Sequence, residues 1–212
     1  MPEPFYFFSE LHLVRLLGVK AKNPGELLEH IKQVPPSAIY YHTHRFLQQH
    51  HYLSPEPPND FAYWVTNILG LEALGESLAS VDIVRFASID ELRNEFIRIL
   101  SDYIATGKYC LDCEAGEEFH FMSCITVVIP TPYVAHTLPE FLSIIPKLSI
   151  HALYFHVFEA RMRLHNAEND FSRWFRDSGQ IKLAEELSRS DPYTITLEGL
   201  REKIIKAVSR YV

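Results

Sequence analysis

The sequence carries one ordered set of aromatic and polar residues twice, and this internal repeat limits the folds that the chain can adopt. Each set has an aromatic pair before a histidine, an Asn-Asp-Phe triplet and a tryptophan. They are Tyr40-Tyr41-His42, Asn59-Asp60-Phe61 and Trp64, then Tyr154-Phe155-His156, Asn169-Asp170-Phe171 and Trp174. The two histidines lie 114 residues apart, as do Phe5 and Phe119. Agreement in register over this length indicates a tandem duplication.

The repeat predicts an α+β protein that is predominantly helical. Each copy opens with an aromatic strand, in which residues such as Phe119 and Phe121 alternate with more polar ones, and short helices follow. We expect a tandem duplication of a small strand-plus-helices module with pseudo-twofold symmetry. Residues 1–104 form the first module, 105–118 a linker and 119–212 the second module. Modules this small leave apolar faces exposed, so we expect both to pack as one globular unit, with their strands sharing a sheet.

Helix start signals recur at matched places in the two copies. Asn23-Pro24, Ser88 with Glu91, and Thr137 with Glu140 are each typical of a helix N-terminus. The histidine motifs are predicted to lie on helices over about 37–51 and 150–164. Asp60 and Asp170 are predicted to be N-caps, with Trp64 and Trp174 pointing inward one turn later.

Charge and composition exclude several classes of protein. The 212 residues carry 20 basic and 27 acidic side chains, a formal net charge of −7, without a run of Lys or Arg. Such a surface repels nucleic acid, so we expect no nucleic-acid partner. The N-terminus lacks the pattern of a signal peptide, and the most apolar run is too short to span a membrane. Three cysteines do not form a disulfide framework. These features predict a cytoplasmic protein that is not bound to a membrane.

The repeated histidines are the residues where a structural and a functional role compete most directly. His42 and His156 each lie among apolar residues at helical spacing, which is typical of a core histidine satisfied by a hydrogen bond. Alternatively, the two rings line a shared pocket between the copies. The first copy alone carries His44, Arg45 and His51, and the second alone carries Arg161, residues suited to binding an anionic ligand.

No metal site or cofactor is predicted with these residues. His42 and His44 diverge on a helix, and no acidic residue lies at ligand spacing from His51. A zinc site formed by Cys110, Cys113, His120 and Cys124 stays open as an alternative to ordinary thiols. Sequence fingerprints of the common enzyme classes, including Gly-rich phosphate loops and nucleophile elbows, do not occur.

Several strings resemble a prokaryotic domain-of-unknown-function family over nearly the whole chain. They are Phe5-Tyr-Phe, Ile39-Tyr-Tyr-His-Thr-His-Arg-Phe-Leu, Pro55-Glu-Pro-Pro-Asn-Asp-Phe-Ala-Tyr-Trp-Val, Pro130-Thr-Pro-Tyr-Val-Ala and Leu153-Tyr-Phe-His-Val-Phe-Glu-Ala-Arg. The resemblance implies an association with glycosyltransferases of trehalose or glycogen metabolism. It supplies no catalytic residues, and Cys110 and Cys113 lie outside the shared strings.

The sequence therefore predicts a non-catalytic binding or regulatory module, linked to carbohydrate metabolism, for a small polar or anionic ligand or a partner enzyme. The ligand-binding candidates are His42, His44, Arg45, His51, His156 and Arg161. The alternative is an enzyme that acts on a sugar or sugar phosphate in a cleft between the repeats. In that hypothesis His42 or His44 is the general base, and Arg45 or Arg161 holds an anion.

Overall fold

A computed structural model describes residues 3–45, 58–83, 85–86, 88–107, 112–160, 168–189 and 196–212. The first half contains β1 (Phe5–Ala21), α1 (Pro24–Gln33), α2 (Pro36–Tyr40), the π-helix η1 (Tyr41–Arg45), α4 (Asp60–Asn67), α5 (Glu72–Ala79) and α6 (Ile89–Ala105). The second half contains β2 (Phe119–Ala135), α7 (Leu138–Ile144), the 3-10 helix η2 (Ile145–Lys147), α8 (Ile150–Tyr154), the π-helix η3 (Phe155–Glu159), α10 (Asp170–Asp177), α11 (Ile181–Ser188) and α12 (Leu197–Val208). The chain is thus an α+β protein that is predominantly helical.

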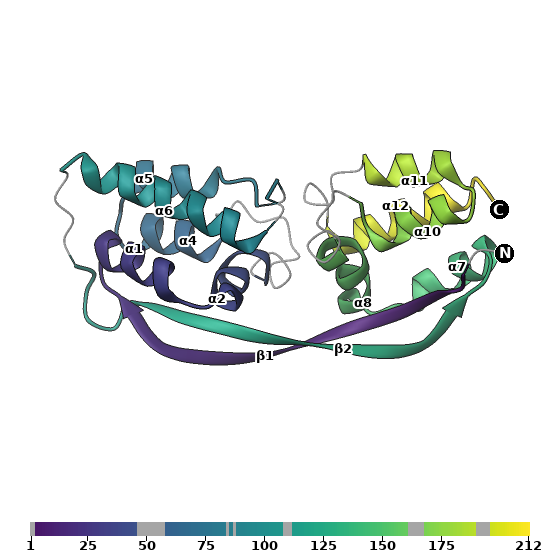
Figure 1. Cartoon of the computed structure of the whole chain (residues 1–212), viewed down its shortest axis with the longest axis horizontal. Helices are drawn as coiled ribbons and strands as arrows, with labels where there is room; N and C mark the ends of the chain where they lie inside the picture. Colours follow the sequence, from purple (N-terminus) through teal and green to yellow (C-terminus); the bar gives the residue numbers. More distant parts are fainter. Residues whose placement is uncertain are drawn as a thin grey trace. The chain divides into compact units, whose positions relative to one another are not determined.

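The sheet consists of β1 and β2 alone among the described residues (Figure 1). The strands are antiparallel and 17 residues long each, and they open the two halves of the chain. The prediction that the opening strands share a sheet is therefore confirmed. None of the described helices is long and apolar enough to cross a membrane.

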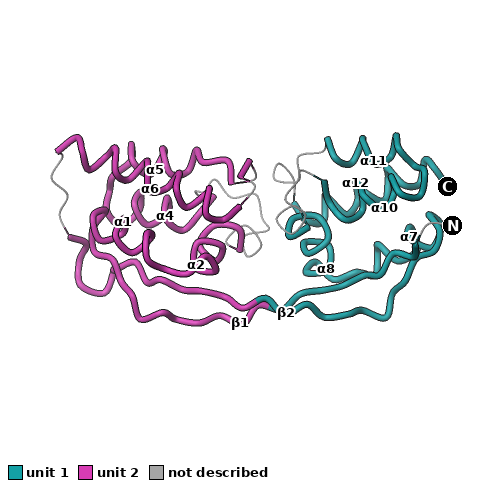
Figure 2. Tube along the Cα trace, in the orientation of Figure 1, with its two compact units in different colours: residues 1–11, 51–53, 126–212 teal, residues 12–50, 54–125 magenta. Residues whose placement is uncertain are grey.

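The described residues divide into two compact units, and the division cuts through both strands (Figure 2). Unit 1 combines the start of β1, up to residue 11, with the helices α7 to α12 of the second half. Unit 2 combines the rest of β1, the helices α1 to α6 and the start of β2, up to residue 125. The start of each strand therefore belongs to the unit that holds the helices of the other half.

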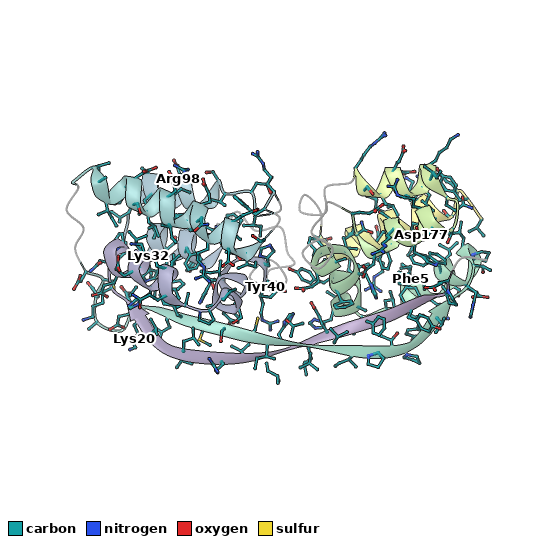
Figure 3. All side chains as sticks on the ribbon, in the orientation of Figure 1. Phe5, Lys20, Lys32, Tyr40, Arg98 and Asp177 are labelled. Carbon is teal, nitrogen blue, oxygen red and sulfur yellow. The ribbon has the colours of Figure 1, made fainter. Side chains whose placement is uncertain are left out.

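Aromatic side chains at the strand starts explain this exchange. Phe5, labelled in Figure 3, and Phe7 are buried in the core of unit 1. There Phe5 contacts the rings of Phe171 and Trp174. Phe119 is buried in the core of unit 2, as is Phe121. Full burial of one such side chain contributes about 1.5–3 kcal/mol relative to leaving it in water. Neither set of helices completes its core without the strand from the other half.

Helix ends follow the sequence signals closely. The side chains of Asn23, Ser88 and Thr137 accept hydrogen bonds from backbone N–H groups of the first turns of α1, α6 and α7. Two arginines donate hydrogen bonds to carbonyl groups at the C-terminal ends of α1 and η2, one in each half. Arg93 donates to the carbonyl of Lys32, and Arg201 donates to the carbonyl of Leu148 at 2.8 Å. The caps act within one helical turn, whereas the two arginines reach these carbonyls from α6 and α12.

Candidate functional site

The two motif histidines lie in π-helical segments rather than in α-helices. α2 changes to η1 at Tyr41, and α8 changes to η3 at Phe155, so each predicted helix begins as an α-helix and becomes π-helical at its motif histidine. The later residues of the predicted ranges, 46–51 and 161–164, lie outside the described residues. A π-helical turn carries an extra residue, which rotates the following side chains relative to those before it.

His42 joins three separate parts of unit 2. Its Nδ1 lies 2.7 Å from a carboxylate oxygen of Asp60 at the start of α4. Its Nε2 accepts a hydrogen bond of 2.9 Å from the backbone N–H of Met122 on β2. The ring is 3% exposed and packs against Phe61 and Phe119.

His156 makes the matching contacts in unit 1. Its Nδ1 lies 2.8 Å from Asp170, and its Nε2 accepts from the N–H of Phe8 on β1 at 2.8 Å. The ring is 2% exposed and packs against Phe5 and Phe171. Each histidine therefore bonds to a carboxylate of its own half and to a strand of the other half. The strand partner lies in the other half of the sequence, which the repeat by itself did not indicate.

The tryptophan of each motif donates a hydrogen bond to a residue just before the strand that its histidine contacts. Trp64 Nε1 donates to the carbonyl of Glu117 at 2.7 Å, just before β2. Trp174 Nε1 donates to the carbonyl of Glu3 at 2.9 Å, just before β1. We call each set of histidine, aspartate and tryptophan a strand clamp: His42, Asp60 and Trp64 in unit 2, and His156, Asp170 and Trp174 in unit 1.

The hydrogen bonds of a strand clamp leave its histidine no nitrogen for other chemistry. Because Nε2 accepts from a backbone N–H, it carries no proton, and Nδ1 must carry the proton that is donated to the aspartate. Both ring nitrogens of the buried imidazole are then occupied by the protein. A general base needs a free nitrogen within hydrogen-bond reach of its substrate. In this arrangement the strand clamps position backbone and transfer no proton to a ligand.

The prediction that Asp60 and Asp170 are N-caps was wrong by one residue. The caps are Asn59 and Asn169, whose side-chain oxygens accept from the N–H groups of Ala62 and Ser172 at 2.9 Å each. Asn caps a helix as well as Asp does, and its amide group can also donate. Asn59 uses that group to bond the carbonyl of Leu78. The aspartates, one position later, direct their carboxylates to the histidines instead.

His44, the second candidate base, is also enclosed. It is 5% exposed, stacks on Tyr40 with ring centroids 5.5 Å apart, and has its Nδ1 3.0 Å from Thr43 Oγ1. Burial lowers the pKa of His44 to about 4, and a hydrogen bond with the backbone of Ile83 opposes the shift. This histidine is neutral near pH 7 and has little contact with solvent.

The remaining predicted residues are not brought together by the described structure. Arg45 is half-buried at the end of η1, whereas His51 and Arg161 lie outside the described residues. Of the proposed zinc ligands, Cys110 lies outside the described residues, His120 is exposed and Cys124 is buried. Cys113 is half-buried, and desolvation raises the pKa of its thiol. Across the described ranges, no three His, Cys, Asp or Glu side chains gather as metal ligands would.

Unit 2 has a pocket of about 820 Å³ that the sequence did not predict. It lies between α5, α6 and the residues 80–82 and 85–86, and its lining is part charged and part apolar. Arg85 and Arg98 supply the positive charge, and Asp82, Glu95 and Asp102 supply the negative charge. Phe86, Ile99 and Tyr103 are among the apolar and aromatic lining residues.

Arg98 is the residue that organises the charges of this pocket (Figure 3). It donates to Glu95 at 2.6 and 3.0 Å and to Asp102 at 2.8 Å. The hydrogen bonds to Arg98 lower the pKa of Glu95, and the two carboxylates raise that of Arg98. Glu95 and Arg98 are therefore charged near neutral pH. In the sequence this triplet has the i, i+3 and i, i+4 spacing of a solvated helix face, which gave no signal of a pocket.

Comparisons with known proteins identify relatives over almost the full chain. The sequence model of a family of unknown function, DUF5752, matches residues 2–209. A solved structure described as "The structure of OrfY from Thermoproteus tenax" is similar, with a TM-score of 0.80 and 29% identity. The similarity covers 98% of this chain and 95% of that one. No protein with a curated description matches.

Proposed function

The chain belongs to the DUF5752 family, and we propose that it is a non-catalytic module that binds a small, uncharged polar ligand of the sugar class in the pocket of unit 2. The observation that carries this proposal is the pocket's volume of about 820 Å³ together with its mixed lining. Ligand sites in proteins occupy about 300–1,000 Å³ and combine apolar walls with a few polar groups that fix orientation.

The charges of the lining favour an uncharged ligand over an anionic one. Three carboxylates face two guanidinium groups, and Arg98 is already bonded to two of the carboxylates. A phosphate would meet a site with a net negative formal charge, which repels it. Hydroxyl groups both donate and accept, so they can bond to Glu95 and Arg98 at once. Tyr103 and Phe86 offer apolar surface to the C–H groups of a sugar ring.

The strand clamps support a non-catalytic role. The alternative hypothesis needs His42 or His44 as a general base in an open cleft. His42 has both ring nitrogens bonded to protein, and His44 is buried beside Tyr40. With these two residues assigned to the fold, the described residues of unit 2 offer binding groups rather than a nucleophile and base pair.

The proposed organisation of the chain is a tandem duplication of one strand-plus-helices module with pseudo-twofold symmetry. Its support is the agreement between the two strand clamps, in which His42 and His156 make the same pair of hydrogen bonds at matched positions. Superposing residues 22–105 on 136–212 tests this organisation by itself. A match of element on element is expected, and two different helix arrangements would contradict it.

Thermal unfolding with a panel of small molecules tests the binding proposal. Monosaccharides and disaccharides should raise the melting temperature, whereas their phosphates should do so less. A ligand at 100 times its dissociation constant stabilises the folded protein by about 2.7 kcal/mol. Failure of every sugar to shift the transition would contradict the proposal, as would equal stabilisation by inorganic phosphate.

A pair of arginine variants locates the binding. Arg98→Ala should abolish the sugar-dependent shift, because it removes the donor and releases both carboxylates of the pocket. Arg189→Ala is the matched control, since Arg189 forms a similar exposed ion pair with Glu185 in unit 1. Both variants should melt near the parent protein without ligand, because exposed ion pairs contribute about 0–1 kcal/mol. Equal ligand responses of the two variants would rule out the pocket as the site.

A further inference from the structure

The last helix of unit 1, α12, presents basic side chains to solvent. Lys203 and Lys206 lie three residues apart on this helix, and Arg210 follows four residues later in the turn that ends it. Side chains at this spacing lie on one face of a helix. All three are exposed, whereas Leu200 and Ile204 belong to the buried stripe of the same helix.

The neighbouring helix α11 extends this basic surface. α11 and α12 both belong to unit 1, drawn in teal in Figure 2, and Arg210 donates a hydrogen bond to Glu186 of α11. Lys182 lies four residues before Glu186 and Arg189 three residues after it, so both flank the point where the helices are joined. Both are exposed. We define the basic face of unit 1 as five residues: Lys182, Arg189, Lys203, Lys206 and Arg210.

The three lysines of the basic face are available to a ligand. The two arginines are bonded within the protein, Arg189 to Glu185 and Arg210 to Glu186. Across the described ranges, the ammonium groups of the lysines form neither a hydrogen bond nor an ion pair. Glu202 is a third acidic residue beside them on α12. With these three glutamates counted, the five cations still leave a positive formal charge.

Unit 2 has the opposite charge at the corresponding places of its last helix. Arg93 and Arg201 both donate to a carbonyl group of an earlier helical segment, and they give the two helices a common origin for counting. The residues two, five and nine places later are Glu95, Arg98 and Asp102 on α6, but Lys203, Lys206 and Arg210 in unit 1.

This difference argues that the basic face is more than an ordinary solvated surface. On α6 the three residues bond to one another, because an arginine lies between two carboxylates. On α12 three positive charges lie at i, i+3 and i+7, where like charges repel one another and lower the stability of the helix. A negatively charged partner that binds outside the chain would relieve this repulsion.

The distribution of charge over the chain favours a short acidic partner over nucleic acid. Unit 1 has 11 basic and 12 acidic side chains and unit 2 has 9 and 15, which together make the 20 and 27 of the whole chain. Unit 1 is therefore nearly neutral, and the basic face is a local feature of it. A duplex carries one negative charge for about every 1.7 Å of its length, so it would extend beyond this face over acidic surface.

The spread of the lysines favours several carboxylates over one small anion. Two of the lysines belong to α12 and one to α11, and the axes of packed helices lie about 8–10 Å apart. A single phosphate cannot contact all three ammonium groups at that separation. A peptide with successive Asp or Glu residues can place one carboxylate at each of them.

We propose that the basic face of unit 1 binds an acidic segment of a partner protein, whose carboxylates pair with Lys182, Lys203 and Lys206. Every residue of this surface belongs to unit 1. The binding is therefore independent of the pocket in unit 2 and of its sugar ligand.

Fluorescence anisotropy of a fluorescein-labelled octaglutamate peptide, titrated with the full chain, tests the proposal. The peptide should bind at about 50 mM salt and at least fivefold more weakly at about 200 mM, because salt screens exposed charges. Octaglutamine with the same label should not bind. Failure of octaglutamate to bind at the lower salt concentration overturns the proposal, as does equal binding of octaglutamine.

Charge-reversal variants locate the binding. Lys203→Glu combined with Lys206→Glu should weaken octaglutamate binding at least tenfold, and Lys182→Glu, on the other helix, at least threefold. Lys20→Glu combined with Lys22→Glu is the matched control, since it changes two exposed lysines of unit 2 and alters the net charge equally. This control should bind within twofold of the parent. Equal losses in the control and in the α12 variant overturn the proposal.

Two further measurements separate this proposal from its alternatives. All three variants should melt near the parent protein, because substitutions of exposed residues change stability little. Loss of binding only in variants that no longer fold overturns the assignment to the basic face. An eight-nucleotide oligothymidylate that binds more tightly than octaglutamate, or inorganic phosphate that displaces the peptide at equal concentration, overturns the choice of an acidic segment.

Discussion

The π-helical segments of the two units occupy matched positions, but they differ in one of their two stacked rings. Tyr40 stacks on His44 four residues later, with an interplanar angle of 7°, and Tyr154 stacks on Phe158 with the same angle. The stacked geometry is kept while a titratable ring in unit 2 is replaced by an apolar one in unit 1. The strand clamps next to them are identical in both units. Contacts that hold the exchanged strand therefore tolerate less change than the residues beside them.

The largest expected effect tests the exchange of strands between the halves. Phe7→Ala should destabilise unit 1 by about 3–5 kcal/mol, because it leaves a cavity in a core made mostly by the second half. Hydrogen exchange should show lost protection in α7 to α12. Phe121→Ala is the counterpart and should weaken α1 to α6 instead. If each substitution loosened the helices of its own half, the exchanged arrangement would be wrong.

Removal of a clamp histidine should have the next largest effect. His42→Ala or His156→Ala removes the partners of a half-buried carboxylate oxygen and of a backbone N–H and leaves a cavity, which costs roughly 1–3 kcal/mol for each variant. Denaturant unfolding measures this loss. His120→Ala, at an exposed position on β2, is the control and should unfold like the parent. A normal transition for both clamp variants would mean that the histidines do not serve the fold.

The stacked pair of Tyr40 and His44 should make the free energy of unfolding depend on acid pH, whereas the pair of Tyr154 and Phe158 has no ring that titrates there. The folded-state pKa of His44 is about 4, below its usual 6.5, so the unfolded chain takes up the proton first as the pH falls. The contribution of His44 to the free energy of unfolding is constant above about pH 6.5 and falls as the pH falls toward 4. Between pH 7 and pH 5 the loss is about 2 kcal/mol. His44→Phe copies the residue of unit 1 and should remove this loss. If the free energies of unfolding of the parent and of His44→Phe fell in parallel from pH 7 to pH 5, the assignment of this loss to His44 would be wrong.

The smallest effect concerns the helix caps. Asn59→Ala should cost about 0.5–2 kcal/mol through the lost acceptor for the first turn of α4, and it also removes the donor to the carbonyl of Leu78. Asn169→Ala should cost a similar amount in unit 1. Comparison by thermal unfolding with Asn67→Ala, which changes an exposed residue at the end of α4, corrects for general effects of the substitution. Equal melting temperatures for Asn59→Ala and Asn67→Ala would count against the cap.

Local features of the fold could be predicted from the sequence, whereas the partners of distant residues could not. Asn23, Ser88 and Thr137 act within one helical turn, so their roles as caps were readable. An internal repeat cannot reveal whether Phe5 packs on its own helices or on those of the other half, because both offer the same aromatic residues. Asn59 and Asp60 are both good caps, and only the distant histidine decides between them.

The candidate pocket could not be predicted from the sequence for a related reason. Arg98, Glu95 and Asp102 have the spacing of an ordinary solvated helix face, and their role depends on residues 80–82 and 85–86 lying opposite. The π-helical turns were also unpredictable, since the spacing of apolar residues around His42 fits an α-helix equally well. In each case the missing information was a contact between segments that are distant in the sequence.

The exchanged strands also bear on how the chain is made. Phe8 bonds to a histidine 148 residues later, and Glu3 to a tryptophan 171 residues later. At about 5–20 residues per second, a ribosome needs roughly 10–40 s to add the 200 or so residues that separate the first strand from the last helix. Throughout that time the Phe5-Tyr-Phe-Phe segment is outside the ribosome without its final neighbours. This segment is therefore synthesised well before the helices that bury it, and during translation it is the natural target for a chaperone.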